Sequence, residues 1–321
     1  MIINNWNTYL KSIHAAPGAI HNIISKRVQD NDLFLPDFRN SNQILIFSDY
    51  GGEHKQSRFT SYSFLISTPF DVQGMFPYIE RLRQKYSTNG RVMNYKNLRD
   101  KLRLQALPEY LHHYNYLNGI MLNVIVDKHN LTSIFMQNGF DLNSEELKDF
   151  EGYKKGVFEK TIRIIHFLSL LINGVCAPGQ DIYWITDDDE IIANDKTLSK
   201  MSSIFRDIIR NYVDFQLGEL VISPLSLNED PHKIIEEFCG IPDLAAGVLP
   251  NLQDHLADYT STFEKNQFVL YEGKLSQKDS ILGGWLSENN NKLPLKNIQF
   301  MISGYGEHML VNSLKIKVIK K

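Results

Sequence analysis

Short apolar runs alternate with longer amphipathic stretches along most of this 321-residue chain. The runs at 43–47 and 62–66 are close enough to pair as a hairpin, and a third lies at 120–126. Polar or turn-forming residues follow these runs, which is typical of buried β-strands. Helical patterns cover 69–86 and 98–117. The first part of the chain therefore predicts three strands, with two helices before the third.

The second part of the chain alternates helices and strands. A long helical pattern at 151–173, closed by Gly174, precedes an apolar strand at 182–186 that runs into an acidic cluster. Strands alternating with helices predict an α/β protein with helices packed on a sheet. The remaining expected elements are helices at 197–215, 231–238 and from 240 onward, and strands at 219–222, 268–271 and 310–318.

Three aspartates fall at the ends of these elements. Asp49 follows the first strand, Asp187 follows the fourth strand, and Asp243 begins the last helix of the alternating region. Each has an ordinary structural explanation, because aspartate is favoured in turns, in exposed loops and in the first turn of a helix. If the first and fourth strands lie side by side with the last helix near their ends, the three carboxylates converge.

Converging carboxylates suit the hydrolysis of a phosphodiester. Hard divalent cations such as Mg²⁺ or Mn²⁺ take carboxylate oxygens as ligands, activate water and stabilise charge on the leaving oxygen. Without a cation such carboxylates repel one another, and their pKa values rise. Glu159, on the helix before the fourth strand, is the expected fourth carboxylate, with Glu151 as the second choice.

The acidic segments resemble those of a known group of bacterial and phage proteins. The segment Ile-Phe-Ser-Asp-Tyr-Gly-Gly at 46–52 and the acidic strand end at 184–191 are similar to two motifs of the ribonuclease-H-like family catalogued as domain of unknown function 3800. Ile-Pro-Asp-Leu-Ala-Ala-Gly at 241–247 resembles its motif Ala-Asp-Leu-x-Ala-Gly, with Pro242 in place of alanine. The resemblance implies that Asp49, Asp187 and Asp243 are metal ligands of a nuclease, a type of protein suspected to act in mobile elements and antiviral defence.

The order of elements fits this resemblance, since a three-strand meander followed by alternating helices and strands is the order of a ribonuclease-H-like fold. We therefore expect a ribonuclease-H-like mixed sheet flanked by helices at 41–258, after an N-terminal lead-in at 1–40. A basic helical insertion is expected at about 70–118. A strand-rich α+β extension is expected at 259–321, where an unpaired edge strand would suit a protein partner.

Basic residues are concentrated in the expected insertion. Only Glu80 and Asp100 oppose them between positions 80 and 103, so this stretch is either a solvated helical face or a phosphate-binding surface. Tyr86 and Tyr95 lie among them as candidate stacking partners for bases. The eight expected nucleic-acid-binding residues are Arg81, Arg83, Lys85, Arg91, Lys96, Arg99, Lys101 and Arg103.

Composition narrows the class of protein. Apolar residues make up 43% of the chain and the formal net charge is −3, as in an ordinary globular protein. The start of the chain does not resemble a secretory signal, and the apolar run at 162–172 is too short to cross a bilayer. The two distant cysteines, Cys176 and Cys239, argue against a disulfide framework. We expect a cytoplasmic protein that does not enter a membrane.

Three alternatives stay open from the sequence. Pro242 and Asp243, with Glu272 and Lys274 after the strand at 268–271, also match the PD…ExK pattern of restriction-endonuclease-like nucleases, although that pattern needs Asp243 at a strand edge. A ribonuclease-H-like scaffold without chemistry could bind nucleic acid or a protein partner. The sequence leaves DNA and RNA equally open as substrates, and His255 is the candidate for proton transfer.

Overall fold

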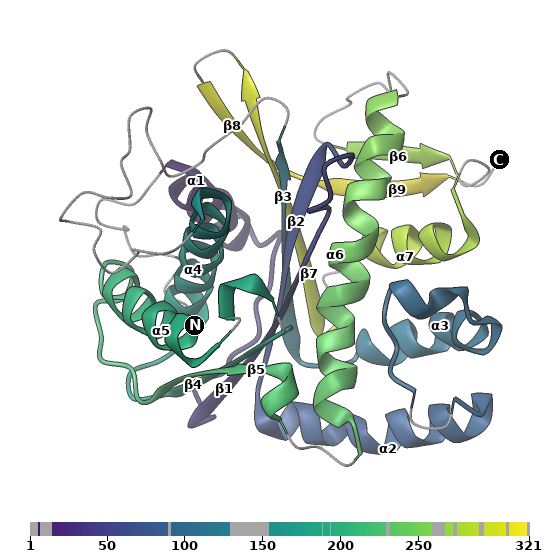
Figure 1. Ribbon diagram of the computed structural model, residues 1–321, viewed down its shortest axis with the longest axis horizontal. Helices are drawn as coiled ribbons and strands as arrows, with labels where there is room; N and C mark the ends of the chain where they lie inside the picture. Colours follow the sequence, from purple (N-terminus) through teal and green to yellow (C-terminus); the bar gives the residue numbers. More distant parts are fainter. Residues whose placement is uncertain are drawn as a thin grey trace.

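A mixed seven-stranded β-sheet runs through the middle of the molecule, with helices on both of its faces (Figure 1). The strands lie in the order β5-β4-β1-β2-β3-β7-β8. Their bounds are β1 Gln43–Gly51, β2 Phe59–Ser67, β3 Gly119–Asp127, β4 Asp181–Thr186, β5 Leu220–Pro224, β7 Leu295–Tyr305 and β8 His308–Ser313. The computed structural model describes Trp6 and residues 15–88, 91–128, 154–187, 189–192, 194–228, 232–258, 267–271, 275–288, 292–305 and 308–319.

The first three strands form an antiparallel meander, and β4 lies parallel to β1 on the other side. The predicted neighbourhood of the first and fourth strands is therefore confirmed. Strand β5 continues the sheet in parallel beyond β4. On the opposite side β7 pairs in parallel with β3, and β8 forms the edge. Residues of the expected C-terminal extension thus extend the central sheet.

Two helical layers bury the two faces of the sheet, and strand alternation assigns each side chain to one of them. On β1, Ile44, Ile46 and Tyr50 belong to the core under the first layer, whereas Phe47 belongs to the core under the second layer. Asp49 therefore points toward the second layer. The first layer contains α1 Ala15–Gln29, α4 Lys155–Val175 and α5 Asp195–Ile209; the second contains α2 Pro69–Tyr86, α3 Lys101–Tyr114, α6 Ile234–Asp258 and α7 Gln277–Ser287.

The α/β class and most of the predicted elements are confirmed, including α2 with its predicted bounds. Two predictions are wrong. Helix α6 is one continuous helix, in which Pro242 is an interior residue, rather than two helices that meet near Gly240. The predicted last strand is two strands separated at Leu314, of which β9 Lys315–Ile319 pairs in a separate two-stranded sheet with β6 Gln267–Tyr271.

Helix α6 crosses β1 and β2 at very close range. A Cβ atom added to Gly51 would lie 2.0 Å from the carbonyl oxygen of Ala246, so only glycine fits there. The Ala246 carbonyl would normally accept the N–H of the residue four positions later, but that residue is Pro250, which has none. Ser61 on β2 donates its hydroxyl to this oxygen instead, at 2.6 Å. The proline in the helix therefore leaves an acceptor that fixes α6 to the sheet.

Among the helices with described residues, none is long and apolar enough to cross a bilayer.

Replacing Gly51 with alanine should destabilise the protein, because the added methyl group cannot fit between β1 and the backbone of α6. We expect Gly51→Ala to lower the free energy of unfolding by about 2 kcal/mol, measured by urea denaturation. Gly74→Ala in α2 is the matched control, since an added Cβ meets no atom within 4 Å there. The free energy of unfolding of the control should rise by up to about 1 kcal/mol, because alanine has a higher helix propensity than glycine. Equal stability of the two variants would contradict the close approach of α6.

Candidate functional site

The three aspartates lie on the side of the sheet that α6 covers. Asp49 lies within β1 near its end, and Asp187 is the residue directly after β4. The parallel register pairs Ser48 with Thr186, so Asp49 and Asp187 follow at the same level on adjacent strands. Asp243 does not begin a helix, as predicted from the sequence, but lies in the third turn of α6.

The carboxyl groups of Asp49 and Asp243 are hydrogen-bonded to each other. Burial, together with the charges of Asp243 and Asp187 and the bond to Asp243, raises the pKa of Asp49 well above its ordinary value. Burial also raises the pKa of Asp243, although the bond from Asp49 opposes this effect. Part of each carboxyl group still reaches solvent, yet the dense surrounding protein makes burial the largest cause. A hydrogen bond between two carboxyl groups requires a proton on one of them, and we call Asp49 and Asp243 the acid pair.

A loop from the inserted region holds Asp243 in place. The backbone N–H of Tyr95 donates to Oδ2 of Asp243. Two glycines on the same face of α6 leave room for this loop: a Cβ atom on Gly240 would lie 2.1 Å from the Met93 carbonyl oxygen, and one on Gly247 would lie 2.4 Å from the Tyr95 ring. Glycine is therefore required three residues before and four residues after Asp243, because the loop lies directly against the helix there.

The side chain of Tyr95 connects the same loop to helix α7. Its hydroxyl donates to Oδ1 of Asp279 at 2.7 Å and accepts from the amide of Asn251 at 2.6 Å. The Nζ atom of Lys278 lies 3.6 Å from the centre of the Tyr95 ring. Sequence analysis did not single out Asn251, Lys278 or Asp279, because nothing local in the chain indicates that α7 packs beside the acid pair.

The structure does not bring Glu159 to the three aspartates. Glu159 is buried on α4, where its Oε1 atom pairs with Nε of Arg163 at 3.0 Å. Arg163 also donates to the hydroxyl of Tyr62, which belongs to the core on the face opposite Asp49. The alternative fourth carboxylate, Glu151, lies outside the described residues.

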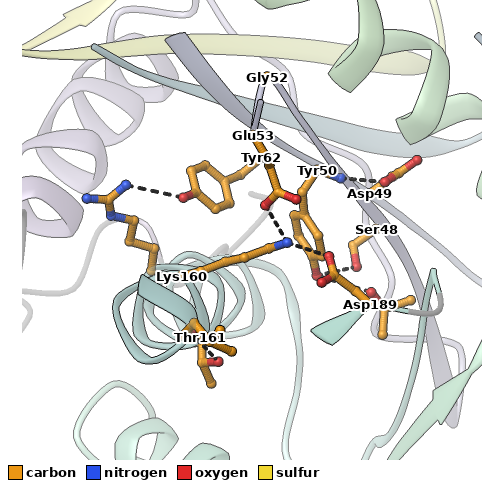
Figure 2. A network of polar contacts seen from close by, with 12 residues as sticks. Ser48, Asp49, Tyr50, Gly52, Glu53, Tyr62, Lys160, Thr161 and Asp189 are labelled. Atoms are coloured by element: carbon orange, nitrogen blue, oxygen red, sulfur yellow. Dashed lines mark hydrogen bonds and ion pairs between the residues drawn. The ribbon is translucent and has the colours of Figure 1, made fainter. Parts of the chain in front are cut away.

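A polar network supports β1 from the α4 side (Figure 2). Lys160 forms ion pairs with Glu53 and Asp189, and its ammonium group lies 4.9 Å from the centre of the Tyr50 ring. The Tyr50 hydroxyl lies 2.9 Å from Oγ of Ser48 and 3.2 Å from the Thr186 hydroxyl. Figure 2 shows Asp49 turned away from this network. The network therefore joins the ends of β1 and β4 on the face opposite Asp49.

The eight basic residues of the inserted region do not form one continuous stripe. Three are paired: Arg83 with Glu237 at 2.9 Å, Lys85 with Glu109 at 2.5 Å, and Arg91 with Asp100 at 3.2 Å. The other five differ in their surroundings. Arg81 lies over the ring of Tyr78, and Arg103 has a buried Nε atom. Lys101 is exposed in the first turn of α3, and Lys96 and Arg99 are exposed on the short 3-10 helix Lys96–Arg99.

Two further sequence-based candidates do not reach the acid pair. His255 lies on α6 itself, but it is twelve positions after Asp243, which corresponds to about 18 Å along a helix. For the PD…ExK pattern, Glu272 and Lys274 lie outside the described residues, and Asp243 is helical rather than at a strand edge. This position of Asp243 disfavours that second nuclease reading.

The donor set fits a hard divalent cation in its chemistry, because all three groups are carboxylates on adjoining elements. The described part of the chain holds no group of three or more His, Cys, Asp or Glu side chains already arranged around a metal position. The side chain of Asp187 is exposed, and its charge contributes to the raised pKa of Asp49. No protein-family model and no curated protein sequence matches this chain.

Replacing the ionisable group of Asp49 should stabilise the fold at neutral pH. The pKa of Asp49 is raised in the folded state, so folding binds a proton more tightly, and stability falls as pH rises from the unfolded value of 3.8 through the folded value. We expect Asp49→Asn to melt at a temperature at least about 2 °C above the wild type at pH 8. The difference should vanish near pH 3.5, where the wild-type carboxyl is also protonated. A melting temperature that is lower than wild type at pH 8 would contradict the shared proton.

Proposed function

We propose that this protein is a metal-dependent nuclease of ribonuclease-H-like fold that hydrolyses phosphodiester bonds of DNA or RNA. The observation that carries the proposal is the acid pair, Asp49 with Asp243, placed beside Asp187 at the next strand end. Aspartates that share a proton and lie close to a third are unfavourable for folding, because burial and like charge both oppose ionisation. Such a cost is typical of functional sites.

The arrangement of the core supports the fold that we propose. The meander β1–β2–β3, the parallel strand β4 beside β1, and α6 across the strand ends are what the ribonuclease-H-like resemblance implies. In this arrangement Asp49 and Asp243 are hydrogen-bonded, and Asp187 follows at the same level on the adjacent strand. Strands β7 and β8 are additions beyond the meander.

Asp49, Asp187 and Asp243 would hold Mg²⁺ or Mn²⁺ once Asp49 loses its proton. When bound, such a cation activates water and stabilises negative charge on the leaving oxygen of a phosphodiester. The protein's own contribution is to position the ligands. The Tyr95 N–H orients Asp243, the β1–β4 register sets Asp49 level with Asp187, and the network around Lys160 supports both strands from behind.

A second candidate is a ribonuclease-H-like scaffold that binds nucleic acid or a protein partner without cutting. It is favoured by one observation: in the described residues, Asp187 does not complete a three-ligand group with the acid pair. In this case the acid pair would be a structural hydrogen bond, and divalent cations would have no specific effect on the protein.

Cleavage should depend on the aspartates and on a divalent cation. Labelled single- and double-stranded DNA and RNA are incubated with the protein in Mg²⁺ or Mn²⁺, and products are resolved on denaturing gels. We expect the Asp49→Asn, Asp187→Asn double variant to be at least about 100-fold slower, a barrier increase of about 2.7 kcal/mol, and EDTA to abolish cleavage.

The control is Asp207→Asn, which removes an exposed carboxyl on α5 that pairs only at the surface with Arg210. It should cut at the wild-type rate. Cleavage by the double variant at that rate would overturn the proposed roles, because the activity would then come from other residues or from a contaminant.

Cation binding can be measured without a substrate. Millimolar Mn²⁺ should raise the melting temperature of the wild type, since a ligand at 100 times its dissociation constant stabilises the folded state by about 2.7 kcal/mol. Asp243→Asn should lose most of this rise, whereas Asp207→Asn should keep it. A rise that is equal in all three proteins, or absent from all of them, would favour the non-catalytic scaffold.

A further inference from the structure

Three basic residues lie on elements next to the acid pair, from two distant parts of the chain. Lys96 and Arg99 lie on the 3-10 helix that directly follows Tyr95, and Lys278 lies in the first turn of α7. The Nζ atom of Lys278 lies 3.6 Å from the centre of the Tyr95 ring. Tyr95 in turn donates its backbone N–H to Asp243. The 3-10 helix that carries Lys96 and Arg99 therefore begins directly after the residue whose N–H is bonded to Asp243.

These three cations differ from the three paired basic residues of the inserted region. Arg83, Lys85 and Arg91 each have a carboxylate partner at 3.2 Å or less. Lys96, Arg99 and Lys278 have no ion pair within 4.0 Å to any carboxylate that the structure describes.

The nearby carboxylates are already engaged in other bonds. Asp279 accepts hydrogen bonds from Tyr95 and from the Ser276 hydroxyl, at 2.7 Å and 2.6 Å. Asp243 accepts from the N–H of Tyr95 and is bonded to Asp49. Both carboxylates are thus held by hydrogen bonds to groups outside the cluster.

Cations held together without a partner repel one another. Burial and the charge of Arg99 lower the pKa of Lys278, while Asp279 and Asp243 oppose this effect. An anion with several oxygens relieves such repulsion best, because it can accept bonds from more than one cation at once. A phosphate group has this shape and charge.

We propose that Lys96, Arg99 and Lys278 form a binding site for a phosphate group next to the acid pair. The proposal deepens the proposed nuclease function and rests on it in one respect, namely that the phosphate belongs to the substrate backbone. Helix α7, from the expected C-terminal extension, then becomes part of the active site. The loop at Tyr95 has two roles, since it orients Asp243 through its backbone and supports Lys278 through its ring.

The site can be tested with inorganic phosphate in EDTA, where neither a cation nor cleavage contributes. The melting temperature is measured from 0 to 50 mM phosphate, with sodium chloride adjusted to keep the ionic strength constant. We expect phosphate to raise the melting temperature of the wild type by about 2 °C or more. Lys278→Gln and Arg99→Gln should each lose at least half of that increase. Lys278→Arg keeps the charge and should keep the rise.

The control is Lys26→Gln, which removes an exposed positive charge from α1 in the opposite helical layer and should respond as the wild type does. Circular dichroism in the absence of phosphate verifies that each variant is folded. Equal rises in the wild type and Lys278→Gln, or no rise in the wild type, would overturn the site.

The outcome is independent of the cleavage assay. Loss of the phosphate response in Lys278→Gln from a protein that cuts nothing would support the anion site and reject the nuclease. Cleavage that depends on Asp49, with an unchanged phosphate response in Lys278→Gln, would support the nuclease and reject the anion site.

Discussion

The close crossing of α6 over β1 and β2 is the contact on which the rest of the site depends. Backbone meets backbone there, with Gly51 below and the Ala246 carbonyl above, and Ser61 supplies the bond that Pro250 cannot. Because no side chain separates the two elements at this point, the height and rotation of the helix are fixed. Asp243, one turn before Ala246, is thereby directed at Asp49.

A second side of α6, next to the one that meets the sheet, is equally constrained. Gly240 and Gly247 admit the loop at Met93–Tyr95 against the helix backbone, and Tyr95 in turn holds α7 through Asp279. Three segments that are remote in sequence are thus arranged around one carboxylate. A helix with larger residues at these two positions would keep its length and its apolar face, but it would hold the loop away from Asp243.

The two faces of the sheet hold charge in different ways. On the α4 face, Lys160 is buried but compensated by Glu53 and Asp189, and Glu159 is matched by Arg163. These pairs are internally balanced and support the strands. On the α6 face the balance is left incomplete, because the acid pair shares a single proton. Incompletely compensated charge of this kind is common at binding and catalytic sites, and the function that we propose uses that face.

The sequence by itself determined the α/β class and most strands and helices, because the apolar periodicity and the turn residues are local signals. The neighbourhood of Asp49 and Asp187 depends on the pairing of β1 with β4, which the sequence suggested only through an assumed topology. The prediction for α6 failed since Pro242 was taken for a first-turn residue. Interior prolines are costly in isolation, but here the packing of both helix faces outweighs that cost. Only the tertiary structure decided the hydrogen bond between Asp49 and Asp243, the separation of Glu159, the pairing of Arg83, Lys85 and Arg91, and the arrival of Lys278. Each of these depends on which residues of distant segments face one another, and a one-dimensional pattern carries no information about that.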